Sequence, residues 1–204
     1  MNRKNQKKKT EGTLQTRAVP AAIRAMSEDP ENRTFQISFS SEEPYDQLWV
    51  GPEILDHSDG AVNLDRLNSI GVVLYNHDRD KVVGRIDKAW TEDGRGLAQI
   101  TFDEDEDSDV IYQKVKSGTL KGVSVGYVVN RYEVVDEGEK SKDGRFDGPV
   151  SVATSWEPLE VSIVSIPADP TVGVGREYIT DADNHCSALT IVKAQMIINK
   201  NYLD

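Results

Sequence analysis

The chain has 204 residues, of which 37% are hydrophobic and 29% charged, and its formal net charge at pH 7 is −11. This length suits one domain with a real core plus tails, and it leaves little room for a second full domain. No apolar run approaches the ~20 residues that span a bilayer, the basic start has no apolar stretch behind it, and the single cysteine, Cys186, excludes an internal disulfide framework.

The first 24 residues differ in charge from the rest of the chain. They hold seven Lys or Arg and one acid, a balance of +6, so the other 180 residues carry −17. An acidic body repels phosphate backbones, which makes nucleic acid a poor candidate partner. We predict a basic, disordered leader over residues 1–32, with an arm that binds nucleic acid, a nuclear-type receptor or an acidic partner as the alternative.

Alternation of apolar and polar side chains predicts most of the remaining chain as β-strands. In the first such segment, Phe35, Ile37 and Phe39 share one face. The predicted strands cover residues 33–41, 72–78, 81–90, 97–102 and 121–136, with one or two more within 150–170. Turn-rich segments join them, and the loop of residues 137–148 is rich in charge and glycine.

Two segments of the body have helical spacing instead. A short helix is predicted within residues 61–71, where Gly71 ends it, and a longer one lies in the acidic stretch that ends at Gly118. These acids lack the spacing of a calcium-binding loop, so we predict no metal site there. The fold class is therefore mainly β with flanking helices (α+β), and we expect a single antiparallel β-barrel of about seven strands, with a sandwich as the alternative.

Ser124 lies in GVSVG, a match to the G-x-S-x-G nucleophile elbow of lipases and esterases. That elbow is a sharp turn from a strand into a helix, and its acid and histidine follow the serine in the chain. Here the motif continues into YVVNRYEVV, which favours a strand, and the histidine that follows, His185, lies in a polar tail. The lipase interpretation is therefore disfavoured.

The chain offers three histidines as bases for a serine nucleophile: His57, His77 and His185. His57 lies in the turn-like DHSDG and is expected to be an exposed loop residue. His185 and Cys186 are sequence neighbours whose side chains point in different directions, which argues against a Cys-His enzyme. His77 ends an apolar strand, where catalytic side chains are often mounted and where structural histidines are also common.

Glu160 lies within the otherwise apolar stretch LEVSIV. A carboxylate embedded in such a strand costs free energy unless it meets a partner, and an imidazole would be one. The alternative is that Glu160 faces solvent on a half-exposed strand, which its alternation with Ser162 permits.

Three ordered stretches, LYNHDRDKVVGRI, KSGTLKGVSVGY and LEVSIVSIPADP, together resemble the three blocks of the tailed-phage prohead protease family. The pieces EILDH and GLAQITF also look like that family. The resemblance covers residues 33–172, which we take as the protease domain, and it leaves residues 173–204 as a tail with a predicted helix near residues 188–198. The fold that it implies is similar to the herpesvirus maturational protease, a β-barrel of about seven strands with surrounding helices.

The resemblance also implies a function and a site. A member of this family would be a serine endopeptidase with Ser124 as nucleophile, His77 as general base and Glu160 as third residue, for which Asp78 and Glu157 are the rivals. It would need no metal or organic cofactor. It would act in the host cytoplasm, inside the assembling prohead, on scaffold protein, on the scaffold-like N-terminal segment of the major capsid protein and on itself, and it could act as a homodimer.

Two other functions remain open from the sequence. The chain could be a non-catalytic β-barrel that serves as a scaffold or capsid-assembly component, or it could be a general esterase. In a structure, the protease interpretation requires the side chains of Ser124 and His77 to approach hydrogen-bond distance.

Overall fold

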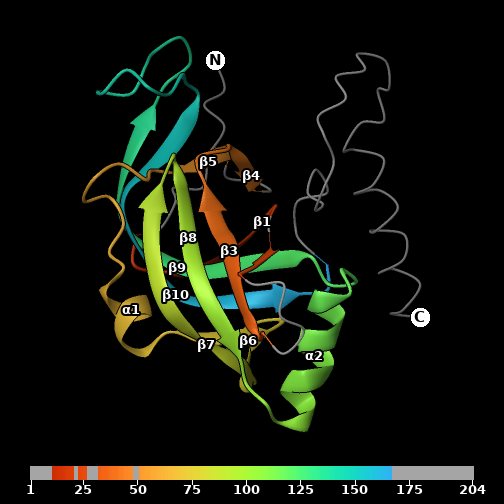
Figure 1. Cartoon of the computed structure of the whole chain (residues 1–204). Coiled ribbons are helices and arrows are strands. Elements are labelled where there is room, and N and C mark those ends of the chain that lie inside the picture. The colour runs from red at the N-terminus through yellow and green to blue at the C-terminus, as the bar shows by residue number, and fades with distance from the viewer. Residues whose placement is uncertain (1–10, 21–22, 27–31, 48–50, 167–204) are drawn as a thin grey trace, which may run out of the picture.

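In the part of the chain that the structure describes, the fold consists of ten strands of one sheet and two α-helices (Figure 1). The computed structural model describes residues 11–20, 23–26, 32–47 and 51–166. Its strands are β1 (Leu14–Pro20), β2 (Arg24–Ala25), β3 (Thr34–Ser41), β4 (Tyr45–Gln47), β5 (Gly51–Leu55), β6 (Val72–Tyr75), β7 (Asp78–Glu92), β8 (Arg95–Phe102), β9 (Gly122–Val135) and β10 (Val150–Val164). The helices are α1 (Asp65–Ile70) and α2 (Glu106–Lys116).

The hydrogen-bonded order of the strands is β1-β9-β10-β6-β7-β8-β3-β2, while β5 pairs with both β10 and β4. Most pairs are antiparallel, but β10 runs parallel to β6 and to β5. The fold is thus mainly β with a few helices, as expected. The expected single barrel of about seven antiparallel strands is not confirmed, because there are ten strands and no pairing within the described residues joins β1 to β2.

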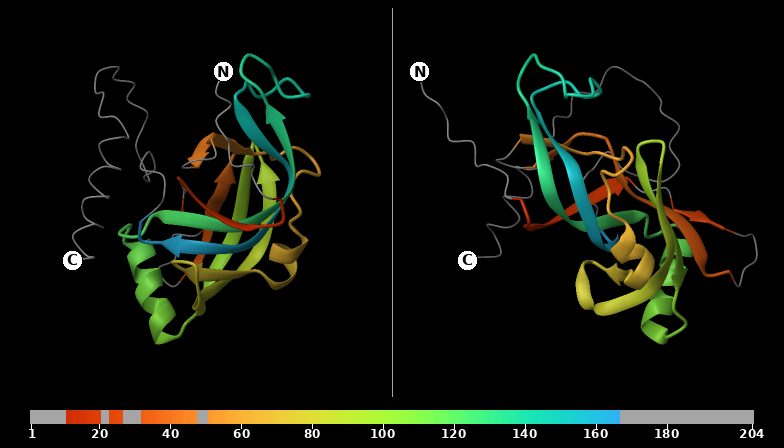
Figure 2. Two further views of the ribbon diagram at one scale, coloured as in Figure 1. Left: turned by 180° about the vertical axis from the view of Figure 1, so that it is seen from behind. Right: turned by 90° about the vertical axis from the view of Figure 1, so that its left-hand side faces the viewer.

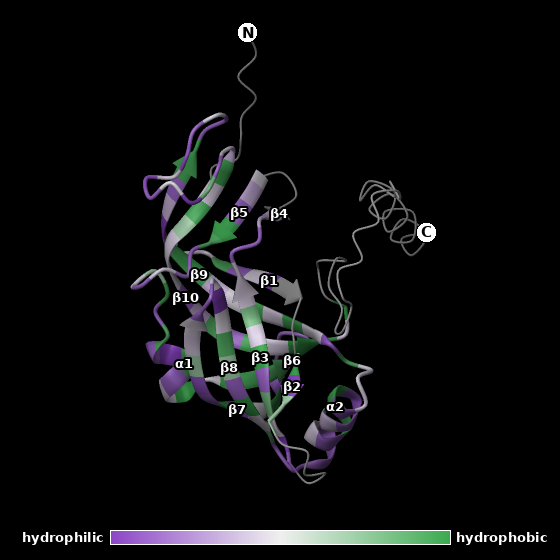
Figure 3. Ribbon diagram, turned by 45° about the horizontal axis from the view of Figure 1, so that its top comes forward, coloured by the Kyte–Doolittle hydropathy of each residue, from purple (hydrophilic) through white to green (hydrophobic). Residues whose placement is uncertain are grey.

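The two longest neighbouring strands, β9 and β10, bend along their length. Their outer halves project as a hairpin, in which β10 pairs with β5 over residues 151–153 (Figures 1 and 2). The loop at its tip contains the predicted charged segment 137–148, whose residues are largely hydrophilic (Figure 3). The inner halves of both strands remain in the main sheet, next to β6 and β1.

Alternation along β9 separates the core from a second, polar face. The side chains of Val123, Val125, Tyr127 and Val129 are fully buried in the main core cluster. Because successive side chains of a strand point to opposite faces, Ser124 lies on the side of β9 that faces away from this core. The predicted apolar face of β3 is confirmed, with Phe35, Ile37 and Phe39 at most 4% exposed.

The helices form where the sequence predicts them. Helix α1 ends at Gly71, and helix α2 begins after Asp105, whose carboxylate accepts a hydrogen bond from the backbone N–H of Ser108 at 3.0 Å. Neither helix in the described part of the chain is long and apolar enough to cross a membrane.

The leader was wrongly expected to be disordered throughout, because part of it forms β1. This strand pairs antiparallel with β9 over seven residues, from Leu14 opposite Val128 to Pro20 opposite Gly122. The side chain of Arg17 is 2% exposed and donates a hydrogen bond to the backbone carbonyl of Glu43. Pairing with a long neighbouring strand stabilises a segment too short to predict alone. Residues 1–10 and the predicted helix near 188–198 lie outside the described residues.

Candidate active site

Three neighbouring strands, β9, β10 and β6, bring the predicted site residues together. In the register of the sheet, Ser162 on β10 lies opposite Ser124 on β9 and beside Leu74 on β6. His77 follows β6 directly, in the turn that leads into β7. Segments that lie 47 and 83 residues apart in the chain thereby meet on one face of the sheet.

The turn that carries His77 is a two-residue hairpin loop. Tyr75 pairs with Asp78, and the two residues between them have positive φ angles, 54° for Asn76 and 61° for His77. Such angles match the twist of a hairpin, and asparagine tolerates them well. The backbone N–H of Asn76 donates to the carbonyl of Ile163 at 2.9 Å, which ties the turn to β10.

The side chains of Ser124, His77 and Glu160 form a continuous hydrogen-bonded row. The distance from His77 Nε2 to Ser124 Oγ is 2.7 Å, and that from His77 Nδ1 to Glu160 Oε1 is also 2.7 Å. A neutral imidazole that donates its Nδ1 proton to the carboxylate has a free Nε2 lone pair for the serine hydroxyl. The expected approach of Ser124 to His77 is therefore found.

Neither of the two rival carboxylates is hydrogen-bonded to His77 among the described residues. Asp78 accepts a hydrogen bond from the backbone N–H of Asp80 at 3.1 Å and lies 3.9 Å from Lys81 Nζ. Glu157 lies opposite Val128, further along β10. Of the three candidates, Glu160 is the one whose carboxylate is hydrogen-bonded to the imidazole.

An irregularity of β10 and a glycine of β9 make room for Glu160. The register between the two strands shifts between Pro158 and Glu160, and such bulges often re-aim side chains next to functional sites. Glu160 then lies opposite Gly126, where a Cβ atom would lie 2.4 Å from Glu160 Oε1. The second glycine of GVSVG therefore leaves space for the carboxylate.

Exposure differs among the three residues. Ser124 is 2% exposed, while the side chains of His77 and Glu160 are 30% and 18% exposed. The most open member of the row is therefore the imidazole.

A second serine-histidine pair lies in the core. Ser40 Oγ is 2.7 Å from His57 Nε2, and both residues are buried, which corrects the expectation that His57 is an exposed loop residue. Burial lowers the pKa of His57 to about 4, so this imidazole is neutral at pH 7. Among the described residues no carboxylate is hydrogen-bonded to its Nδ1 atom, so this pair lacks a third member.

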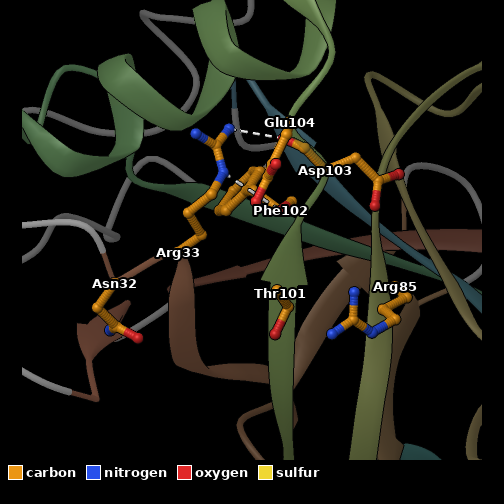
Figure 4. Close-up of a pocket in the computed structure, with 7 residues that line it drawn as sticks. All are labelled: Asn32, Arg33, Arg85, Thr101, Phe102, Asp103 and Glu104. Atoms are coloured by element: carbon orange, nitrogen blue, oxygen red, sulfur yellow. Dashed lines mark hydrogen bonds between the residues drawn. The ribbon is translucent and has the colours of Figure 1, made fainter.

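A surface pocket lies elsewhere on the molecule (Figure 4), and it contains none of the three predicted site residues. Both arginines that line the pocket already form ion pairs. Arg33 is paired with Asp109 at 2.8 Å and bonds the carbonyl of Phe102, and Arg85 is paired with Asp87 at 2.9 Å. The pocket is lined by Asn32, Arg33, Arg85, Thr101, Phe102, Asp103 and Glu104. In the described part of the chain no group of three or more His, Cys, Asp and Glu side chains is placed to hold a metal ion.

Some residues were missed or are not described. Ser162 touches both Glu160 and His77, but in the sequence it is one polar residue of an alternating strand, with no signal of its own. His185 and Cys186 lie outside the described residues.

A buried serine, a histidine and a carboxylate in this hydrogen-bonded order are the arrangement of serine hydrolases, placed here on a mainly β fold. The model of the family described as caudovirus prohead serine protease matches residues 58–183. The chain belongs to that family.

Two further comparisons give a sequence relative and a solved structure of similar fold. The chain is 36% identical over 169 residues to a protein of Halomonas phage phiHAP-1 named major capsid protein. The match covers 81% of this chain, which spans about a quarter, 26%, of that relative. The fold is similar to that of the bacteriophage T4 capsid assembly protease, gp21, with a TM-score of 0.50 and 12% identity, covering 76% of this chain and 98% of the T4 chain.

Proposed function

We propose that this chain is a serine endopeptidase of phage capsid maturation, in which Ser124 is the nucleophile, His77 the general base and Glu160 the carboxylate that orients the imidazole. The observation that carries the proposal is the row of two 2.7 Å contacts from Ser124 Oγ through His77 to Glu160 Oε1. Membership in the prohead serine protease family supports it.

The mechanism follows from these contacts. Ser124 Oγ attacks a peptide carbonyl while His77 Nε2 takes its proton, and the imidazolium then donates that proton to the leaving amine. Glu160 fixes the imidazole with its proton on Nδ1 and stabilises the positive charge that forms on the ring. Water hydrolyses the acyl-enzyme by the same proton transfers in the opposite direction.

The core pair Ser40–His57 supports the choice of nucleophile by contrast. Its oxygen-to-nitrogen distance is the same 2.7 Å, but both residues are buried and no carboxylate orients the imidazole. The pair at Ser124 combines that distance with a 30% exposed imidazole and a carboxylate partner. Distance alone therefore does not distinguish the two serines, whereas access and the third residue do.

We infer that the substrates are capsid components: the scaffold protein or the scaffold-like N-terminal segment of the major capsid protein, and the chain's own termini. The support is the family, together with the likeness to a quarter of a relative named major capsid protein. Cleavage would then take place within the assembling prohead, in the host cytoplasm.

The test is co-expression of the full chain with the major capsid protein of the same phage, followed by mass spectrometry of both proteins. Wild type should shorten the capsid protein, and Ser124→Ala should leave it intact while folding normally. Ser40→Ala is the matched control, because it removes the hydroxyl of the other serine-histidine pair and should leave cleavage unchanged. Processing that persists in Ser124→Ala would refute the assignment.

A second candidate function is a non-catalytic capsid-assembly component. The observation that favours it is the name of the Halomonas phage relative, a major capsid protein. This function predicts that wild type and Ser124→Ala assemble with capsid protein equally well and that neither shortens it. The same co-expression experiment therefore separates the two candidates.

A further inference from the structure

We propose that Ser162 is a positioning residue of this site, whose hydroxyl holds the Glu160 carboxylate and the main chain of His77 in the arrangement that aligns the imidazole with Ser124. The inference rests on the proposed function of the site. It adds a fourth side chain that does not touch the reacting atoms.

Ser162 lies at the centre of the site. It is fully buried on β10, between Ser124 on β9 and Leu74 on β6 in the register of the sheet. Its chain neighbours Val161 and Ile163 point into the core, so its own side chain lies on the face that carries Ser124. A fully buried hydroxyl at this position needs hydrogen-bond partners.

Its partners are two parts of the proposed triad. Ser162 Oγ donates to Glu160 Oε2 at 2.7 Å and accepts from the backbone N–H of His77 at 3.1 Å. A hydroxyl has one proton to donate, and here the carboxylate takes it. The contact of Ser162 Oγ with His77 Nδ1 is longer, 3.4 Å, and the Nδ1 proton goes to Glu160 Oε1 at 2.7 Å.

Both contacts restrain groups that could otherwise turn. Glu160 presents Oε1 to the imidazole only while its carboxylate keeps one orientation, and the bond from Ser162 fixes the other oxygen. His77 has a left-handed φ of 61°, and such a conformation persists only where its surroundings hold it. Ser162 therefore links the carboxylate to the turn that carries the base.

Ser108 is a buried serine that makes a useful comparison. It is also fully buried, but it lies on α2, and among the described residues it makes no hydrogen bond to Ser124, His77 or Glu160. If the hydroxyl of Ser162 only filled space, alanine at either position should have the same small effect. If it positions the triad, alanine at 162 should affect catalysis and alanine at 108 should not.

Kinetics of the full chain with a cleaved capsid peptide provide the first measurement. Ser162→Ala should lower kcat about 10- to 100-fold with KM changed by less than about twofold, because it misaligns the groups without removing a binding contact. Ser162→Thr retains the hydroxyl and should recover most of kcat. Ser108→Ala should match wild type. Equal kcat values in wild type and Ser162→Ala would overturn the proposal.

A low-field proton NMR spectrum provides a measurement that does not depend on cleavage. The His77 Nδ1 proton, assigned by the loss of its resonance in His77→Gln, should give a low-field signal in wild type and in Ser162→Thr. That signal should move upfield or broaden by exchange in Ser162→Ala. An unchanged signal would count against the proposal even if kcat fell.

The two measurements separate the inference from the function on which it rests. A signal that changes in Ser162→Ala while no variant cleaves peptide supports the positioning role and contradicts the protease. Cleavage that needs Ser124, with kcat and signal unaffected in Ser162→Ala, contradicts the positioning role alone. If Ser162→Ala does not fold, Ser162→Cys, with its weak donor, replaces it under the same expectations.

Discussion

Gly126 lies directly opposite Glu160, and a methyl group on this glycine would lie 2.4 Å from Glu160 Oε1. We therefore predict that Gly126→Ala displaces the carboxylate from His77 and lowers kcat about 100-fold, the effect of a misplacement of about 1 Å. Steady-state kinetics should show the loss mainly in kcat. Circular dichroism and thermal unfolding should show that the fold is retained.

A double variant tests whether Gly126 acts through Glu160. If it does, Gly126→Ala combined with Glu160→Gln should be no slower than Glu160→Gln alone, because the orienting contact is already lost. If the fold-losses in kcat of the two single variants instead multiply in the double variant, Gly126 has a separate role on β9.

Replacing each candidate carboxylate by its amide identifies the third residue of the proposed triad. Glu160→Gln should lower kcat about 100- to 10,000-fold, because an amide can orient the imidazole in the wrong tautomer and cannot stabilise its positive charge. Asp78→Asn, beside the histidine in the chain but paired elsewhere, should stay within about threefold of wild type. The reverse order of the two effects, measured with the same peptide, would reassign the role to Asp78.

The buried His57 predicts a pH dependence of stability. Burial lowers its pKa in the folded protein to about 4 from an ordinary value of 6.5, so between these two pH values the unfolded chain binds the proton more readily. Stability contributed by the neutral imidazole should therefore fall as the pH drops from 6.5 to 4 and then level off, a loss of roughly 3 kcal/mol in all.

Urea unfolding at a series of pH values measures this loss. His57→Gln should flatten the dependence between pH 6.5 and 4, whereas His77→Gln, which removes the other paired histidine, should keep it. An unchanged slope in His57→Gln would assign the acid sensitivity to carboxylates instead.

The buried carboxylate of Glu53 predicts a stability effect away from the site. Glu53 is fully buried, and it accepts hydrogen bonds from the hydroxyls of Tyr127 and Tyr132. Burial raises the pKa of the Tyr127 hydroxyl, which keeps it a proton donor. Tyr127→Phe should lower the free energy of unfolding by about 1–3 kcal/mol, because it removes a donor from a buried acceptor.

Tyr132→Phe is the matched control. It removes the hydroxyl from a partly exposed tyrosine and should lower the free energy of unfolding by less than Tyr127→Phe does. Both variants should retain activity, because the Tyr127 side chain points into the core, away from Ser124. Denaturant unfolding that ranks the two losses in the opposite order would contradict this account.

The three predicted site residues could be identified from the sequence because each has a local signature. Ser124 lies between glycines, His77 ends an apolar strand, and Glu160 interrupts an apolar run. The structure brings Ser124 and Glu160 each within hydrogen-bond distance of His77, and the catalytic roles of the three residues remain predictions.

Other features depend on contacts between distant segments and were not predictable. His57 looks like a loop residue, but Ser40 and the ring of Trp156, 5.5 Å away, enclose it. Ser162 has the same pattern as a serine that faces solvent. Strand β1 lies in a basic segment, and it is its pairing with β9 that orders it.

Strand β10 lies between β9, which carries Ser124, and β6, which leads into the turn with His77, and it is the last of the described strands to be synthesised. A nascent chain that ends before Val150 already contains Ser124 and His77, but it lacks the strand that joins β9 to β6, and it lacks Glu160. During translation the proposed peptidase should therefore be inactive. Peptide cleavage would begin only after β10 has been made and has inserted into the sheet.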